Sequence, residues 1–156
     1  MPILTKLREF LDKQKVPYEV LSHRQAFTAQ EVAQAQHVRG AELAKVVMLR
    51  SGAQFIMAVL PAPYRIELHR AKDAIGKPDL VLATEQEFQG LFPQREAGAM
   101  PPFGNLYGVP VYVDLTLSRD EDIVFNAGTH TQTVKMKYAD FARLVQPKVC
   151  SFAATP

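Results

Sequence analysis

One lysine stands directly in front of an apolar run that has the composition of a buried strand. Lys45 is followed by Val46, Val47, Met48 and Leu49. An ammonium group in this position would lie at the mouth of a sheet, where ligands commonly bind. The alternative is an ordinary solvated lysine at the end of a strand, which is the more common arrangement. Lys45 is therefore a candidate ligand-binding cation that needs support from other residues.

A second candidate is the segment from Gly98 to Gly104, which reads Gly-Ala-Met-Pro-Pro-Phe-Gly. Glycine lets the backbone approach a ligand closely, and proline holds a loop rigid. Such a loop can aim backbone N–H groups at a developing negative charge. A plain connecting loop is the alternative interpretation.

The third candidate is a polar turn, Asn126-Ala127-Gly128-Thr129-His130, which joins two apolar runs. A tight hairpin without a chemical role is the alternative. Taken one at a time, none of these three segments defines an activity.

The sequence patterns of several common catalytic sites are absent. There is no phosphate-binding loop of the GxxxxGK[ST] type, no GxGxxG, no HExxH and no GxSxG. The single cysteine, Cys150, has no partner for a disulfide or a metal site and is interpreted as a half-buried, small apolar residue. No two histidines are four residues apart, so we expect no metal site; the histidines are His23, His37, His69 and His130.

Length and composition limit the class of protein. The chain has 156 residues, of which 47% are hydrophobic and 22% charged, with a net charge of +2. This predicts one domain over residues 1–156 that buries a core of its own and is not disordered. The longest apolar runs are far shorter than the ~20 residues of a membrane span. The start of the chain predicts a helix and no signal segment, so a reducing cytoplasm is the expected compartment.

Helices and strands are predicted to alternate along the chain. Helices are expected at 3–15, from Thr28 to about Gln36, at 67–75, in a short stretch after Thr84, and at 138–145. Strands are expected at 18–21, 45–50, 54–60, 80–82 (buried), 109–114, 123–125 and 131–136. Ser51-Gly52 is expected as a hairpin turn, 93–108 as a long rigid loop and 114–122 as a polar turn. The fold class is therefore α/β of the mixed (α+β) kind, with a curled or barrel-like mixed sheet flanked by helices.

A functional role for the three candidate segments is better supported when they are considered together, because they occur in a fixed order with several other motifs. Over residues 16–145 the chain resembles the YbaK-like aminoacyl-tRNA editing domain. This family includes free-standing trans-editing deacylases and the insertion domain of bacterial prolyl-tRNA synthetases. The motifs that carry the resemblance are those at 27–33, 44–47, 55–61, 82–87, 98–104, 109–114 and 125–130.

The resemblance implies hydrolysis of the ester that joins a wrong amino acid to the 3′-terminal ribose of a tRNA, without a metal or other cofactor. The ribose hydroxyl or a positioned water would supply the nucleophile. Lys45 matches the essential lysine of the family, and its ammonium suits the terminal phosphate or ribose of the CCA end. Gly98 and its neighbours would donate backbone N–H groups to the carbonyl oxygen. Pro101 and Pro102 have no N–H, so Ala99, Met100 or the flanking residues must donate.

The resemblance also implies a pocket for the amino acid. Gly128 and His130 match the turn that borders this pocket, where His130 would position the substrate ammonium or a water, or would only cap the turn. Further substrate-binding roles are predicted for Val46, Met48, Ala99, Met100, Pro101, Pro102, Phe103, Asn126 and Thr129. Apolar walls favour a small noncognate residue such as alanine, cysteine or serine, on tRNA(Pro) or a related tRNA, because an editing site works as a second sieve.

One residue departs from the family pattern. Many members place Asn or Thr after the lysine, where this chain has Val46. The departure favours the alternative of a non-catalytic module of the same fold that binds tRNA or a synthetase. A small-molecule-binding or structural protein unrelated to tRNA is the remaining alternative. The expected partner is aminoacyl-tRNA, with weak contacts from Arg24, Arg39, Arg65 and Arg70. A synthetase or elongation factor is a further expected partner, and a membrane is not.

Overall fold

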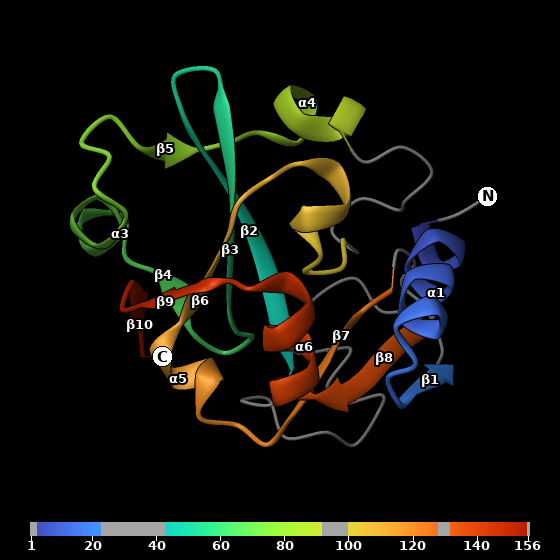
Figure 1. Cartoon of the computed structure of the whole chain (residues 1–156). Coiled ribbons are helices and arrows are strands. Elements are labelled where there is room, and N and C mark those ends of the chain that lie inside the picture. The colour runs from blue at the N-terminus through green and yellow to red at the C-terminus, as the bar shows by residue number, and fades with distance from the viewer. Residues whose placement is uncertain (1–2, 23–42, 92–99, 128–131, 156) are drawn as a thin grey trace.

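The centre of the fold is a hairpin of two eight-residue strands, β2 (Ala44–Ser51) and β3 (Gln54–Pro61). The computed structural model describes residues 3–22, 43–91, 100–127 and 132–155 (Figure 1). In it the hairpin forms the middle of a five-stranded sheet of order β5-β2-β3-β6-β9. The antiparallel hairpin and β5 are joined on the other side by β6 and β9, which pair in parallel. The added strands are β5 (Val81–Leu82), β6 (Val111–Asp114) and β9 (Lys148–Cys150).

A second, three-stranded antiparallel sheet has the order β1-β8-β7. Its strands are β1 (Tyr18–Ser22), β7 (Asp122–Asn126) and β8 (Gln132–Lys137). A parallel bridge between Leu43 and Val124 connects it to the start of β2. A third small sheet pairs β4 (Arg65–Ile66) with β10 (Ala153–Ala154). The predicted mixed α/β architecture is confirmed, and in the described residues the strands form three sheets rather than a closed barrel.

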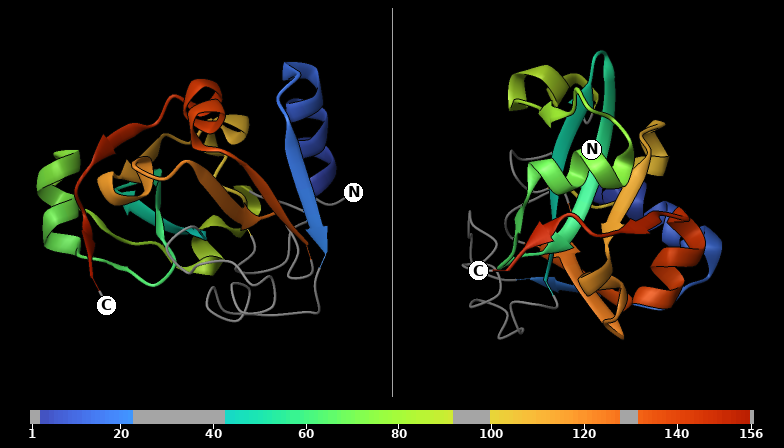
Figure 2. Two further views of the ribbon diagram at one scale, coloured as in Figure 1. Left: turned by 90° about the horizontal axis from the view of Figure 1, so that it is seen from below. Right: turned by 90° about the vertical axis from the view of Figure 1, so that its left-hand side faces the viewer.

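The helices begin and end at residues that satisfy their free backbone groups. The carboxylate of Glu67 accepts from the first N–H groups of α3, and Gly76 ends this helix with a left-handed φ of 79°. Thr84 and Glu87 form the predicted capping box of α4. The helices are α1 (Ile3–Gln14), α3 (Leu68–Ile75), α4 (Glu85–Phe88), α5 (Leu115–Ser118) and α6 (Tyr138–Val145). Two 3-10 turns are η2 (Gln89–Leu91) and η3 (Gly104–Tyr107). Helices α1 and α3 lie at opposite ends of the molecule (Figures 1 and 2).

Two apolar cores lie on the two faces of the central hairpin. Because side chains alternate along a strand, Ala44, Val46 and Met48 face the larger core, which α1, α6 and the second sheet complete. The opposite face of β2, with Val47 and Leu49, packs on the smaller core beneath α3. Lys45 belongs to this second set by its position, so it points away from the larger core.

An aromatic cluster at the middle of the larger core fixes the segment before η3. Phe103 is fully buried, and the ring centroids of Phe10, Phe125 and Phe141 lie 6.2, 5.5 and 5.4 Å from its own. These rings come from α1, β7 and α6, so Phe103 connects three elements that are distant in sequence. Edge-to-face contacts of this kind add to the free energy gained by burial.

Gly104, the next residue, has no room for a side chain. A Cβ atom there would lie 2.7 Å from the carbonyl oxygen of Val109 and 2.9 Å from Cγ2 of Val111. We expect Gly104→Ala to lower the free energy of unfolding by about 1–3 kcal/mol, since the backbone at Val109, just before β6, must shift. Gly90→Ala is the matched control, because nothing lies within 4 Å of its added Cβ. Chemical denaturation of both variants tests this, and equal stabilities would contradict it.

Several predictions about local structure were wrong. Residues 80–82 were expected to be a buried strand, but Val81 and Leu82 are 38% and 53% exposed because β5 is an edge strand and only Leu80 turns inward. The expected polar turn at 114–122 contains α5, and Ser51 belongs to β2, which leaves Gly52 and Ala53 to form the turn. Strands β4, β9 and β10 and the turn η3 were not predicted. The helix expected from Thr28 to Gln36 lies outside the described residues.

Candidate active site

Lys45 is a half-buried cation without a described counter-ion. It is the second residue of β2, opposite Leu60 of β3. No ion pair within the described part of the chain involves it. Burial lowers the pKa of the Lys45 ammonium, since desolvation disfavours the charged form. A positive charge that is partly removed from water and not neutralised by the described residues favours an anionic ligand.

The Leu43–Val124 bridge places the start of β2 beside β7. The bridge is parallel, so two residues further along each strand are Lys45 and Asn126. Alternation puts both on the same face as the bridged pair, while Phe125 faces the larger core. Lys45 and Asn126 therefore share one face of the joined sheets, on the side away from the larger core.

Thr133 lies on this face too and was not singled out from the sequence. It pairs directly with Asn126 across β7 and β8, and is fully buried. The Asn126 side-chain oxygen Oδ1 and the Thr133 hydroxyl Oγ1 are both buried, and neither has a hydrogen-bond partner among the described residues. Buried polar atoms normally have hydrogen-bond partners, so these two are candidates for contact with a ligand. In the sequence, the only indication of this role is the place of Thr133 in the strand that follows the turn beginning at Asn126.

One residue next to each of the three predicted segments belongs to the larger core, and convergence of the segments on one site stays a prediction. Ala44 precedes Lys45, Met100 follows Ala99, and Ala127 precedes Gly128, and all three flanking residues belong to the larger core. Pro101 and Pro102 are buried beside Met100. Five of the predicted site residues, Gly98, Ala99, Gly128, Thr129 and His130, lie outside the described residues.

The predicted wall residues lie on the other side of β2 from Lys45. Met48 and Phe103 are buried in the larger core, and Val46 packs against it. By packing in or against the larger core, these side chains fix the backbone position of β2 and of the segment around Met100. Direct contact between these side chains and a substrate stays a prediction.

The remaining candidate nucleophile, Cys150, is poorly suited to catalysis. It is half-buried, and its pKa is raised first by burial and second by the negative charge of Asp114. Because the thiolate is the reactive form, both effects keep the thiol unreactive. The interpretation of Cys150 as a half-buried, small apolar residue agrees with its position.

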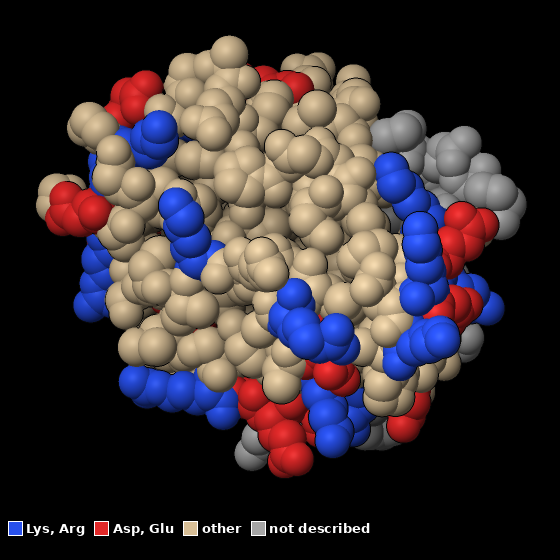
Figure 3. Space-filling model, viewed as in Figure 1, with Lys and Arg blue, Asp and Glu red and all other residues tan. Residues whose placement is uncertain are grey.

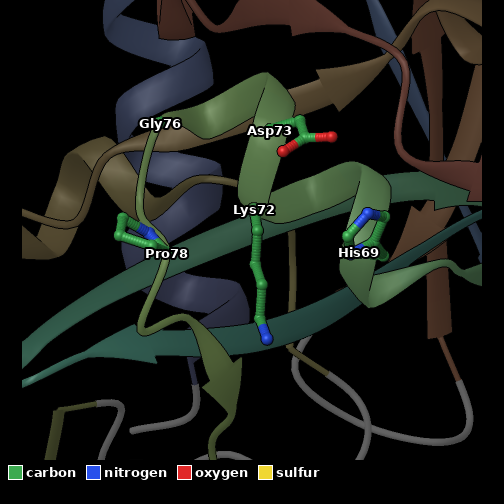
Figure 4. A pocket seen from close by; sticks show the side chains of 5 residues that line it. All are labelled: His69, Lys72, Asp73, Gly76 and Pro78. Atoms are coloured by element: carbon green, nitrogen blue, oxygen red, sulfur yellow. The ribbon is translucent and has the colours of Figure 1, made fainter.

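A hollow of about 500 Å³ lies away from these residues, against α3. His69, Lys72 and Asp73 line it from the helix and Gly76 and Pro78 from the following turn, with the Lys72 side chain between His69 and Pro78 (Figure 4). It holds charges of both signs and none of the predicted site residues. We therefore place the candidate site at Lys45 and not in this hollow.

The described residues offer neither a metal site nor a helix that could cross a membrane. Those residues contain no group of three or more His, Cys, Asp or Glu side chains that could hold a metal ion. Their helices are all too short or too polar to cross a membrane. The expectation that the protein uses no metal and no cofactor stays a prediction.

These features define the class of fold as a mixed α/β domain, with a half-buried lysine at the start of the central hairpin. Among solved structures, the fold matches a protein described as a trans-editing enzyme for prolyl-tRNA synthetase. The TM-score is 0.83 at 20% identity, covering 99% of this chain and 98% of that one. It also matches the hypothetical protein APE2540, with a TM-score of 0.86 at 18% identity, covering 96% and 99% of the two chains.

The chain belongs to the aminoacyl-tRNA editing domain family, whose model matches residues 23–144. A relative from Escherichia coli K12, the multifunctional Ser/Thr-tRNA deacylase ProXp-y, is 26% identical over 155 residues, which cover 96% of this chain and 92% of that protein. A protein of the same name from Escherichia coli O157:H7 matches equally well. The resemblance seen in the sequence is confirmed, and with it the prediction of an enzyme of the aminoacyl-tRNA deacylase class.

Proposed function

We propose that this chain hydrolyses the ester bond between serine and the 3′-terminal ribose of a mischarged tRNA, acting in trans. Serine belongs to the set of small residues expected from the sequence, and it is one of the two amino acids in the name of the Escherichia coli relative. The observation that carries the proposal is the half-buried Lys45, without a described counter-ion, on the same face as Asn126. Alanine, cysteine and threonine are the competing substrates, and tRNA(Pro) or a related tRNA is the expected carrier.

The proposed reaction needs little from the protein beyond positioning and charge. A water attacks the carbonyl carbon, with the neighbouring ribose hydroxyl positioning it. The bond from this carbon to the ribose ester oxygen breaks, the amino acid leaves as the free acid, and the ribose oxygen takes up the proton that the water loses. The Lys45 ammonium anchors the terminal phosphate or ribose, so that the ester is held in place for attack. Backbone N–H groups near Gly98 would stabilise the negative charge on the carbonyl oxygen, an effect of about 3–4 kcal/mol for one good donor.

One face of the molecule offers no continuous basic surface for the body of a tRNA. On the face shown in Figure 3, Lys and Arg lie mainly along the edges, interspersed with Asp and Glu, around a largely uncharged middle. A protein that binds nucleic acid over a wide area usually has a clear basic stripe. We therefore propose that a synthetase or an elongation factor supplies further affinity, in the cytoplasm, and that residues 1–156 act as one domain.

A panel of mischarged tRNAs tests this proposal. The purified protein is incubated with tRNA carrying serine, threonine, alanine, cysteine or proline, and the remaining ester is measured over time. We expect seryl-tRNA to lose its ester much faster than in buffer and prolyl-tRNA(Pro) to persist. Loss of no ester faster than in buffer would contradict the proposal. Binding of intact aminoacyl-tRNA in that case would identify a binding module without turnover.

A further inference from the structure

We infer that Asn126 and Thr133 select amino acids that carry a side-chain hydroxyl, with Asn126 as the contacting residue and Thr133 as a positioning residue. The inference rests on the proposed function, because it concerns the amino acid of the same site. Asn126 was a candidate substrate-binding residue on family resemblance alone. The structure assigns it a partner and a chemical preference.

The two side chains are held close together by the end of the β7–β8 hairpin. The N–H of Ala127 donates to the carbonyl of Gln132 at 3.3 Å. This bond flanks the opposed pair Asn126–Thr133 and makes it a pair without mutual backbone hydrogen bonds, the kind whose side chains approach most closely. Thr133 is also opposed by Leu21 of β1, so it lies in the middle of a three-stranded sheet and cannot move away.

Burial divides the roles between the two residues. Thr133 is fully buried, whereas Asn126 retains partial exposure at the last position of β7. Asn126 is therefore the residue nearer the surface and Thr133 the one behind it, while the Asn126 Oδ1 atom itself is covered. Asn126 also shares its face with Lys45, the proposed anchor of the CCA end. The side-chain hydroxyl of a bound serine or threonine ester would thus lie on the same face of the sheet as the Asn126 side chain.

The unpaired atoms point to a hydroxyl as the missing group. The Asn126 Oδ1 atom can only accept a hydrogen bond, whereas the Thr133 hydroxyl can donate or accept one. A serine or threonine hydroxyl can donate to Asn126 while the Thr133 hydroxyl fixes the orientation of the amide. Alanine offers no such donor and would leave the buried oxygen unpaired. A site of this kind rejects a substrate that lacks the hydroxyl more strongly than an apolar pocket does.

Thr133→Val tests the inference, since it removes the hydroxyl and keeps the shape. We expect kcat/KM for seryl-tRNA to fall about 10- to 100-fold and that for alanyl-tRNA to change less than about 3-fold. Thr133→Ser should restore most of the preference for serine. Tyr138→Phe is the matched control, because it deletes another buried hydroxyl without a described partner, at the larger core and away from this face. Thermal unfolding of each variant shows whether it is folded.

Two results would overturn the inference while leaving the proposed function intact. One is an unchanged ratio of seryl to alanyl hydrolysis in Thr133→Val, whether or not both activities fall equally, and the other is an equal change of the ratio in Tyr138→Phe. An equal loss would indicate that the pair contacts the α-ammonium group, which all aminoacyl-tRNAs share. If Thr133→Val does not fold, the same ratio is measured on Asn126→Ala, which removes the contacting amide, and an unchanged ratio there would overturn the inference. Absence of hydrolysis by the unmodified protein, in contrast, contradicts the proposed function itself.

Discussion

Lys45→Met is expected to lower the rate of ester hydrolysis by about 100-fold, because an ester that is no longer anchored is misplaced for attack, and a misplacement of about 1 Å can cost this much. Methionine has a similar length and fills the same half-buried space, so packing against Leu60 is kept. The lost property is the positive charge. Deacylation of seryl-tRNA under single-turnover conditions separates the loss of catalysis from a loss of binding.

The same substitution is expected to leave the thermal unfolding temperature unchanged or to raise it. Burial lowers the pKa of Lys45 in the folded protein relative to the unfolded chain. A cation whose pKa is lowered on folding destabilises the fold at neutral pH, and this cost disappears only above the unfolded pKa of about 10.4. Removing the charge at pH 7 therefore removes the unfavourable free energy of burying the Lys45 ammonium. A gain or no change in stability with a large loss of activity is typical of a functional residue.

Lys148→Met is the matched control, because Lys148 lies in a strand of the same sheet but is exposed, with its ammonium 5.9 Å from the ring of Tyr112. It should change hydrolysis by less than about 3-fold, since an exposed cation contributes little. An equal effect of the two substitutions would show that the general charge of the protein, and not the position of Lys45, supports activity. A large loss of stability in Lys45→Met would assign Lys45 a structural role.

Local sequence patterns predicted the elements that depend on neighbouring residues. The β2–β3 hairpin, α3 with its Gly76 end and the α4 capping box are set by alternation, by a glycine and by a Thr-x-x-Glu pair within a few residues. Helix α6 was predicted at its observed bounds, because its apolar positions follow the helical period. The position of Lys45 at the start of a strand followed from the same kind of pattern.

Features that depend on residues far apart in the chain were missed. Strand β9 (Lys148–Cys150) forms because it pairs in parallel with β6, more than thirty residues earlier in the chain. A run of three residues contains no sequence pattern that predicts such a pairing. The partnership of Asn126 with Thr133 depends on the register of the β7–β8 hairpin. Family resemblance named Asn126, but it could not say which residue stands behind it. Helix α5 is the exception, since Asp114 two residues before Thr116 was a readable capping signal.

Asp114 is expected to be the most sensitive position for stability. Its buried carboxylate accepts hydrogen bonds from the N–H groups of Phe152 (2.8 Å), Ala153 (2.9 Å) and Thr116 (3.1 Å) and from the Thr116 hydroxyl. One side chain thereby joins the end of β6 to α5 and to the C-terminal segment. Asp114→Ala leaves these donors unpaired and should lower the free energy of unfolding by about 3–5 kcal/mol. Asp114→Asn keeps one acceptor oxygen and should cost about 1–3 kcal/mol.

The pH dependence gives an independent measurement of the same interaction. Burial alone would raise the pKa of Asp114, but the hydrogen bonds from Thr116, Phe152 and Ala153 outweigh burial and hold the pKa below its usual value. A carboxylate with a depressed folded-state pKa contributes stability above the unfolded value of about 3.9, and this contribution is lost as pH falls through the folded pKa. The stability of Asp114→Asn should therefore fall less steeply than that of the unmodified protein below about pH 4. Asp73→Asn, at an exposed position on α3, is the control and should keep the original slope; parallel curves for all three proteins would show that the Asp114 carboxylate is not the group that titrates.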